Sequence, residues 1–246
     1  TELLGKYYKR LIQPMANFMT RYIDSRTSLP CASYDLWERL YLTTTYTTSL
    51  VYGALLEAAS LAEKMHETED AVAWQSCAET IKTKSAILYD EDQGCFIKGF
   101  VYDGETMIRD KTIDISSVYG AYMFGLYDID SPEVVSSLSV CKRQLKTSDR
   151  HPVLARFEDD EYDRVDPSRV GNPWFVTTLW LAQHAFEVND VAAANAILAW
   201  AQSMMLATSV LPEQFDADDL HFISVAPLTW SQAEFVNCLL DSVSGE

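Results

Sequence analysis

The sequence predicts an all-α fold in which helices pair into hairpins, as in an α/α toroid or a solenoid. Eight segments carry apolar side chains three or four residues apart, the spacing of helices with one buried face. Short turns alternate with long polar loops, so the long loops would all lie at one end of the array. A four-helix bundle has too few helices. No internal repeat of the length found in TPR, ankyrin or HEAT arrays is visible.

The first half of the chain is predicted to hold four of these helices. Residues 2–24, 45–65 and 68–90 each place apolar or aromatic side chains along one face. Residues 94–104 read GCFIKGFVYDG, which alternates in polarity and ends in an Asp-Gly pair typical of a tight hairpin turn. Helical spacing returns at residues 113–126. We expect at most this one small β-hairpin in the chain.

Capping residues mark the four helices of the second half. The stretch SPE at 131–133 supplies an N-cap, a first-turn proline and an early acid, and opens a helix that runs to about residue 146. The pair NP at 172–173 is expected to cap a helix to about residue 188, and Asp190 one to about residue 207. The stretch TWSQ at 229–232 matches a capping box and starts the last helix.

Three long loops are predicted at residues 25–44, 147–171 and 208–228, with short turns near residues 66, 129 and 189. Long loops inside a compact domain usually carry function. No Pro/Gly/Ser-rich linker divides the chain, and its length suits one large domain, so we expect a single domain over residues 1–246.

The amino-acid composition restricts the classes of ligand that the protein could bind and the cellular compartment in which it is expected. A formal net charge of −17 disfavours nucleic acid and anionic membrane surfaces, and no apolar run is long enough to cross a bilayer. Aromatic residues make up 12% of the chain, which fits either a large core or an aromatic-lined cleft. The 5 scattered cysteines lack metal-site spacing and predict free thiols. With no signal-peptide layout at the start, they weakly favour the cytoplasm.

Most catalytic motifs are missing from the loops. The 4 histidines share no i, i+4 pair, and the acids at 216–219 lack EF-hand spacing, so neither a metal nor a cofactor is expected. There is no GxSxG and no Gly-rich phosphate loop. What remains is Glu38 beside Trp37 in one loop and Glu213 in another. From the residues alone, these are either a catalytic carboxylate pair or two ordinary surface acids among 36.

The chain resembles the glucoamylase family, glycoside hydrolase family 15, from about residue 30 to its end. Six segments carry the resemblance in the family's order: YDLWER, TYTTSLVYGAL, ARFEDDEY, GNPWFVTTLWLA, LPEQFD and PLTWSQAEFV. The resemblance implies an (α/α)6 toroid and an inverting, exo-acting α-glucoside hydrolase that releases glucose from oligo- or polysaccharide chain ends. Glu38 matches the family's general acid and Glu213 its general base. Positions that contact substrate in the family match Leu36, Trp37, Arg156 and Trp230.

The sequence departs from the family in two ways, and these departures favour a second hypothesis over a hydrolase. Arg39, which we group with the substrate-binding residues, stands where many members carry a second glutamate, and a cation there opposes the protonated form that Glu38 needs as an acid. About eight of the twelve toroid helices are expected here, so the missing N-terminal part of the toroid is a candidate partner. The rival is a non-catalytic carbohydrate-binding or regulatory glucoamylase-like domain. Neither hypothesis predicts whether α-1,4, α-1,6 or trehalose linkages are recognised.

Overall fold

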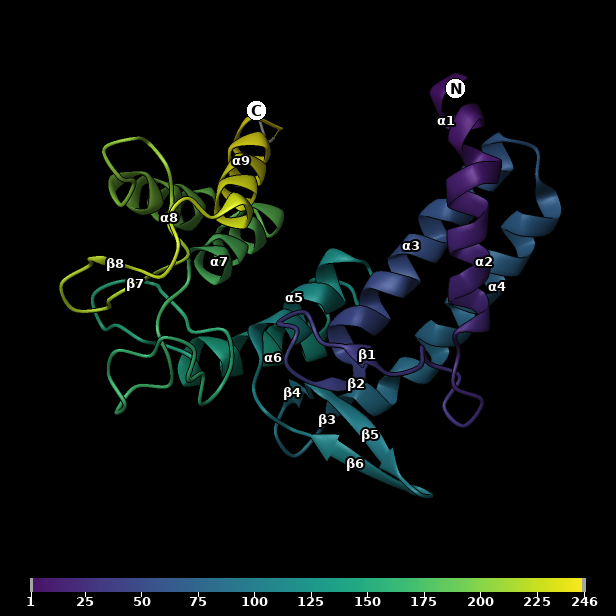
Figure 1. Cartoon of the computed structure of the whole chain (residues 1–246), viewed down its shortest axis with the longest axis horizontal. Coiled ribbons are helices and arrows are strands. Elements are labelled where there is room, and N and C mark those ends of the chain that lie inside the picture. Colours follow the sequence, from purple (N-terminus) through teal and green to yellow (C-terminus); the bar gives the residue numbers. More distant parts are fainter. Residues whose placement is uncertain (1, 245–246) are drawn as a thin grey trace. The chain divides into compact units, whose positions relative to one another are not determined.

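The periodic segments form helices, and the computed structural model describes them over residues 2–244 (Figure 1). The chain divides into two compact units. The N-terminal unit comprises residues up to 111 together with 117–137, and the C-terminal unit comprises 112–116 together with the residues from 138 onward. Each unit is mostly helical and carries small antiparallel sheets. The single domain predicted over residues 1–246 stays a prediction.

Three helical rods lie side by side in the N-terminal unit (Figure 1). The first is one continuous helix with a π-helical segment in its middle, and it confirms the predicted helix except for its last turn. The second and third form a hairpin, and a short 3-10 helix replaces the predicted last turn of the third. The elements are α1 (Glu2–Tyr7), η1 (Tyr8–Ile12), α2 (Gln13–Arg21), α3 (Thr45–Lys64), α4 (Thr68–Lys84) and η2 (Ser85–Leu88).

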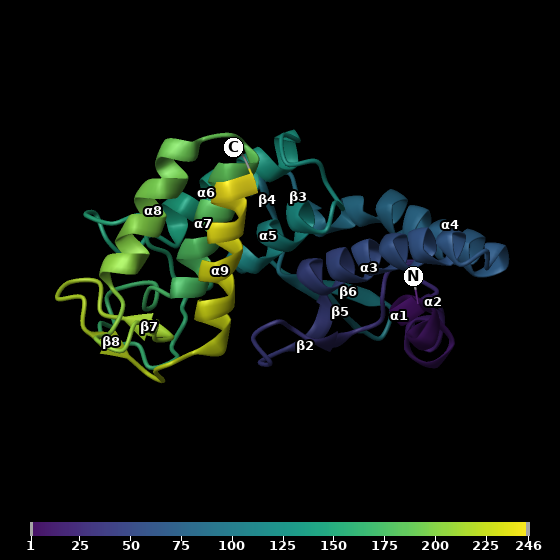
Figure 2. The same ribbon diagram turned by 90° about the horizontal axis from the view of Figure 1, so that it is seen from above.

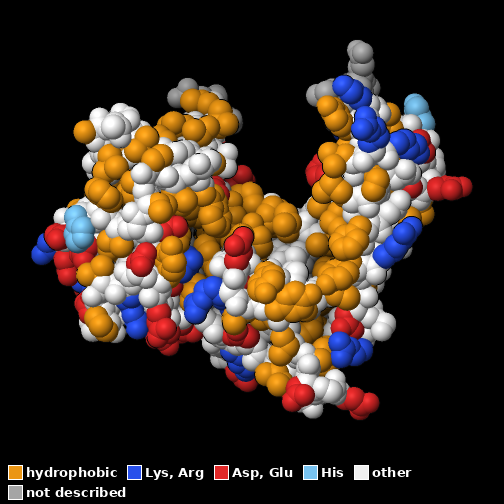
Figure 3. Space-filling view, in the orientation of Figure 1, with side chains coloured by type: hydrophobic (Ala, Val, Ile, Leu, Met, Phe, Trp, Pro, Cys, Tyr) orange, Lys and Arg blue, Asp and Glu red, His pale blue; other side chains and the backbone are white. Residues whose placement is uncertain are grey.

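The core of this unit lies between α3, α4 and the sheet beneath them. Trp74 and Ile81 of α4 and Leu55 of α3 are fully buried, as the helical spacing predicts. Other hydrophobic side chains stay at the surface of the first rod (Figure 3). Leu11, Met15 and Phe18 are between 51% and 61% exposed.

The prediction of at most one hairpin was wrong. Residues 25–44, expected as a loop, contain two strands of a four-stranded antiparallel sheet with the order β1-β2-β5-β6. The strands are β1 (Ser33–Tyr34), β2 (Tyr41–Thr44), β5 (Gly99–Asp103) and β6 (Thr106–Asp110). A second pairing joins β3 (Tyr89–Asp90) to β4 (Cys95–Phe96). The two-residue strands are too short to show an alternating pattern, so only the alternating segment that contains β5 and its Asp-Gly turn was visible in the sequence.

Glycine is required at two positions of the β5–β6 hairpin. Gly104, in the turn, has a φ of +58°, a left-handed conformation that glycine adopts at little cost. A side chain at Gly99 would collide with the Thr43 carbonyl oxygen. Because Gly99 has no side chain, β5 can approach β2 closely enough to pair with it.

Three helices pack together in the C-terminal unit (Figure 2): α7 (Phe175–Glu187), α8 (Val191–Ser203) and α9 (Thr229–Ser244). Two further helices, α5 (Ile115–Met123) and α6 (Pro132–Gln144), cross the boundary between the units. With α1 to α2 counted as one rod, the described residues form the eight predicted helices. The long loop 208–228, expected without strands, contains the pair β7 (Gln214–Phe215) and β8 (Phe222–Ile223).

The structure confirms the predicted cap of α8 but not those of α7 and α9. The Asp190 carboxylate accepts a hydrogen bond from the Ala193 amide at 3.1 Å and caps α8 as expected. The N-cap of α7 is Trp174, not Asn172. The expected capping box of α9 does not form as such, because Gln232 donates from its side chain to the Leu211 carbonyl at 2.8 Å. Among residues 2–244, no helix is both long and apolar enough to span a bilayer.

Candidate active site

Glu38 lies in a tight turn that Asp35 closes. The turn joins β1 to β2, and the Asp35 amide donates to the Leu40 carbonyl at 2.8 Å. In return, Asp35 Oδ1 accepts hydrogen bonds from the amides of Arg39 at 2.7 Å and Leu40 at 3.1 Å. The Glu38 amide donates to the Asp35 carbonyl at 3.0 Å. A single aspartate therefore fixes the backbone on both sides of Glu38.

Glu38 has an unusual backbone conformation and an open side chain. Its φ is +57°, in the left-handed region that costs a non-glycine residue roughly 1–2 kcal/mol. Its carboxylate is exposed and has no hydrogen-bond or ion-pair partner among the described residues. Eight other non-glycine residues in the described part of the chain also have a positive φ, so this conformation alone does not identify a functional site. The turn therefore holds the Glu38 backbone in a conformation that lowers stability, and it exposes the carboxylate to solvent.

A buried ion pair anchors this turn to the sheet. Lys98, just before β5, places its Nζ 3.1 Å from Asp35 Oδ2, and the two side chains are 4% and 3% exposed. The Lys98 carbonyl also accepts from the Thr45 amide, at the start of α3, at 3.0 Å. Asp35 is therefore held at both carboxylate oxygens, one by the turn and one by Lys98. Sequence reasoning missed Lys98, because nothing near it in the chain resembles a site.

The neighbours of Glu38 differ in burial. Trp37 is only 8% exposed. Leu36 is half-buried and Arg39 is exposed. All three share the Glu38 turn, as their places in the sequence require. Their roles in substrate binding stay predictions.

Glu213, in the C-terminal unit, has the opposite environment. It is 9% exposed, and its amide donates to the Val225 carbonyl at 3.0 Å. Its Oε2 accepts from the Ser224 hydroxyl in a short hydrogen bond and from the Gln214 side-chain amide at 3.4 Å. Within the described residues, the groups that hydrogen-bond to this carboxylate are thus neutral. Ser224 has a φ of +65°, so a second left-handed residue borders the site.

Arg156 is buried and held rigidly. Its Nε and Nη2 donate to the two carboxylate oxygens of Asp160 at 2.7 and 2.8 Å, a bidentate ion pair. The guanidinium carbon lies 4.1 Å from the ring centre of Trp174 and 5.2 Å from that of Tyr162. The Asp160 pair and the two rings fix the orientation of the guanidinium plane. The run of acids in ARFEDDEY gave no sign that Asp160, rather than its neighbours, takes this place.

Trp230, in the first turn of α9, has a fixed ring orientation. Its indole N–H donates to Glu234 Oε1 at 2.8 Å, and its ring meets Trp180 edge-on with centroids 5.9 Å apart. Glu234 is 7% exposed and also accepts from the Gln183 side chain at 2.6 Å. Sequence reasoning missed Glu234, although its spacing of four from Trp230 on a helix is a usable signal.

The start of α7 connects the predicted residues of the C-terminal unit. Trp174 stacks on Arg156 and forms an isolated β-bridge with Gln214, beside Glu213. The Phe175 amide donates to the Glu213 carbonyl at 3.3 Å. From α9, the Ser231 hydroxyl donates to the Pro212 carbonyl at 2.9 Å. Arg156, Glu213 and Trp230 thus belong to one framework. Glu38 lies in the other unit, so its pairing with Glu213 stays a prediction.

One group of potential metal ligands is present in the described residues. Asp216, Asp219 and His221 place ligand atoms within 4.8 Å of one another on a surface loop. These side chains form hydrogen bonds within the loop itself. Asp216 Oδ1 accepts from the Asp218 amide at 2.7 Å, and hydrogen bonds from His221 lower the pKa of Asp219. Hydrogen bonds within the loop therefore explain why these three side chains lie close together.

Residues 4–194 match the family model for glycosyl hydrolases family 15. The chain belongs to glycosyl hydrolase family 15. An uncharacterized glycosyl hydrolase of Methanocaldococcus jannaschii is 27% identical to this family 15 chain over 244 residues, covering 93% of the chain and 36% of the relative. A probable glucoamylase of Schizosaccharomyces pombe is 22% identical over 252 residues, covering 85% of the chain and 54% of the relative. The chain thus spans about a third to a half of the curated relatives it matches.

A solved structure confirms the fold of the family 15 chain. A bacterial glucoamylase complexed with acarbose superposes with a TM-score of 0.80 at 18% identity, covering 98% of this chain and 38% of that one. At this identity the likeness concerns the fold alone. The mostly helical chain with small sheets therefore corresponds to part of a glucoamylase-type toroid.

Proposed function

We propose that this family 15 chain carries the two catalytic carboxylates of an inverting, exo-acting α-glucoside hydrolase of glucoamylase type. The family 15 match over residues 4–194, together with the ordered motifs that align Glu38 and Glu213 with the family's acid and base, supports the assignment most directly. Glu38 is exposed on a strained turn and has no partner in the described residues, whereas Glu213 is buried and hydrogen-bonded by Ser224 and Gln214. The hydrogen bonds from Ser224 and Gln214 fix the position of the Glu213 carboxylate, and a general base needs a fixed position to reach one water molecule.

In this mechanism Glu38 donates its proton to the glycosidic oxygen as the bond from that oxygen to the anomeric carbon breaks. Glu213 accepts a proton from a water molecule whose oxygen attacks the opposite face of the same carbon. One proton is given and one taken, the configuration inverts, and β-glucose leaves an α-linked chain end. Inversion requires the carboxyl groups to lie roughly 6.5–9.5 Å apart, so that the water fits between them.

The remaining predicted residues bind the sugar in this scheme. Asp160 fixes the Arg156 guanidinium by its Nε and Nη2, so the guanidinium has a defined orientation for binding sugar hydroxyls. Trp230 offers a ring whose orientation is set by Glu234. Leu36 and Trp37 supply apolar surface next to the acid. Rigid contacts of this kind reduce the ordering that a flexible sugar chain otherwise demands of its site.

The test is hydrolysis of maltose, isomaltose, dextrin, dextran and trehalose by the full-length protein and its variants. Glu38→Gln and Glu213→Gln should each lower the rate by about 10²–10⁴-fold, the usual contribution of general acid–base catalysis. Glu161→Gln, at an exposed acid in the 147–171 loop, is the matched control and should retain full activity. Hydrolysis of none of these sugars, or unchanged rates in both glutamine variants, would exclude the proposal.

A non-catalytic carbohydrate-binding domain is the second candidate, and the exposed Arg39 beside Glu38 is the observation that favours it. Titration calorimetry with acarbose, the ligand of the bacterial glucoamylase, separates the two. Binding without release of glucose from any substrate supports the second candidate. Binding together with glucose release supports the hydrolase.

A further inference from the structure

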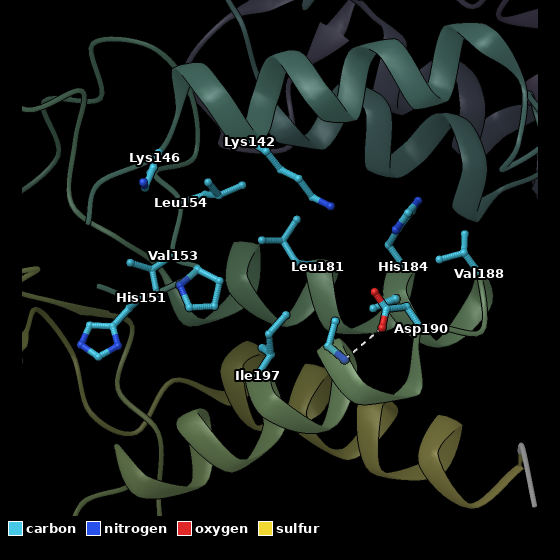
Figure 4. A pocket seen from close by; sticks show the side chains of 13 residues that line it. Lys142, Lys146, His151, Val153, Leu154, Leu181, His184, Val188, Asp190 and Ile197 are labelled. Atoms are coloured by element: carbon cyan, nitrogen blue, oxygen red, sulfur yellow. Dashed lines mark hydrogen bonds between the residues drawn. The ribbon is translucent and has the colours of Figure 1, made fainter. Parts of the chain in front are cut away.

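The C-terminal unit contains a pocket that is lined by none of the residues assigned to the candidate active site (Figure 4). Its volume is 370 Å³, and it lies between the end of α6, the loop at residues 151–154, α7 and α8. The lining is mostly apolar and includes Val153, Leu154, Leu181 and Ile197. A volume of this size is within the range of pockets that hold small molecules.

Most charged groups around this pocket already have partners. The Asp190 carboxylate caps α8 by accepting from the Ala193 amide. Lys146 forms an ion pair with Asp149 at 2.8 Å. Lys142 differs, because no carboxylate oxygen among residues 2–244 lies within ion-pair distance of its ammonium group. Figure 4 shows its side chain extending from α6 over the pocket toward His184.

The electrostatics of the pocket favour an organic anion. Burial and the nearby Lys142 lower the pKa of His184 to about 4, so this imidazole is neutral near pH 7. Desolvation also lowers the pKa of Lys142, and the nearby Asp190 carboxylate opposes this effect. The pocket therefore presents the Lys142 ammonium group, whose charge the nearby Asp190 carboxylate offsets only in part, above an apolar floor.

We propose that this pocket binds an amphipathic carboxylate, with the carboxylate on the Lys142 ammonium group and the hydrocarbon part against Leu181 and Ile197. A neutral sugar suits it less well, because the floor offers mainly apolar surface and few hydrogen-bonding groups. A simple inorganic anion would leave the apolar floor uncovered. The charge and the floor together select a molecule with one acidic end and one apolar end.

Titration calorimetry of the full chain with octanoate tests this proposal. We expect a single site, with no measurable binding of acetate, which lacks the apolar part, or of octanamide, which lacks the charge. Lys142→Met should weaken octanoate binding by about tenfold to a hundredfold, the range for one hydrogen bond to a charged group. Lys146→Met is the matched control, because this lysine lines the same pocket but is already paired with Asp149, and it should change binding little.

A second variant fills the pocket without touching its charge. Ala193→Phe, at a half-buried lining position, should abolish octanoate binding while the circular dichroism spectrum stays that of the wild type. The proposal is overturned if octanoate does not bind at millimolar concentration, if acetate binds equally well, or if Lys142→Met binds octanoate as tightly as the wild type. The hydrolysis assay is independent of all these outcomes.

Discussion

Lys98 Nζ lies 3.1 Å from Asp35 Oδ2, and neither side chain is more than 4% exposed. The pair connects the sheet to the turn that holds Glu38, because the other oxygen of Asp35 accepts the amides of Arg39 and Leu40. A buried ion pair contributes little net stability compared with an apolar pair of the same shape, but it is costly to break from one side. Here the Asp35–Lys98 ion pair fixes the position of the turn that carries Glu38.

Removing the charge of Lys98 should therefore destabilise the protein. Lys98→Met leaves the Asp35 carboxylate buried without its cation, and we expect unfolding in urea to become easier by about 3–5 kcal/mol. Lys9→Met is the control, because Lys9 pairs with Glu67 at the surface, where an ion pair contributes about 0–1 kcal/mol. Equal effects of the two variants would show that the Asp35–Lys98 pair does not hold the turn.

Glu38 should show a conflict between stability and activity. Replacing it with glycine removes the left-handed strain at φ +57°, and the flexibility of glycine in the unfolded chain offsets part of this gain. We expect Glu38→Gly to stabilise the protein by up to about 1 kcal/mol while hydrolysis is lost. Glu38→Gln keeps the strain and should leave the urea midpoint unchanged. If glycine destabilises the protein, the strain assigned to this turn is absent.

Glu234 should act on substrate binding through Trp230. Glu234→Leu removes the acceptor of the Trp230 indole N–H, and we expect KM for dextrin to rise about two- to tenfold with a smaller change in kcat. Glu234→Gln keeps a side-chain oxygen that can accept the same hydrogen bond and should restore KM. A fall in kcat alone, or no rescue by glutamine, would contradict this positioning role.

His184 should make stability fall in mild acid. Its pKa is lowered to about 4 by burial and by Lys142, against an ordinary value of 6.5, so the unfolded chain takes up a proton on this residue first as the pH drops. The stability contributed by neutral His184 is fully present above pH 6.5 and is lost as the pH falls toward 4. Urea midpoints measured across this range should therefore decline more steeply for the wild type than for His184→Gln. Parallel curves would show that His184 titrates normally.

The sequence predicted the helices well and the local geometry of the site poorly. Periodic apolar residues determine which face of a helix is buried, so α3, α4 and α8 appeared close to where they were expected. Strands of two residues depend on partners far along the chain and leave no pattern of their own. The Asn172 side chain looked like a helix cap but donates to Gln214 Oε1 at 2.8 Å, a contact that exists only in the folded chain.

Predictions of the site depended on ordered motifs rather than on local chemistry. The resemblance predicted Glu38, Glu213, Arg156 and Trp230 as site residues, but it did not reveal that one glutamate is exposed and the other buried. The residues that hold them, Lys98, Ser224, Asp160 and Glu234, come from other parts of the chain or from runs of similar residues. Their roles follow from distances in the folded protein, which the sequence does not contain.

The two glutamates are distinguished most directly with α-glucosyl fluoride. Fluoride leaves without help from an acid, whereas the attacking water still needs a base. Glu38→Gln should therefore hydrolyse α-glucosyl fluoride at nearly the wild-type rate, although it fails on maltose. Glu213→Gln should lose about 10²–10⁴-fold on both substrates. Equal losses for the two variants on the fluoride, or a selective loss in Glu38→Gln, would contradict the assignment of Glu38 as the acid and Glu213 as the base.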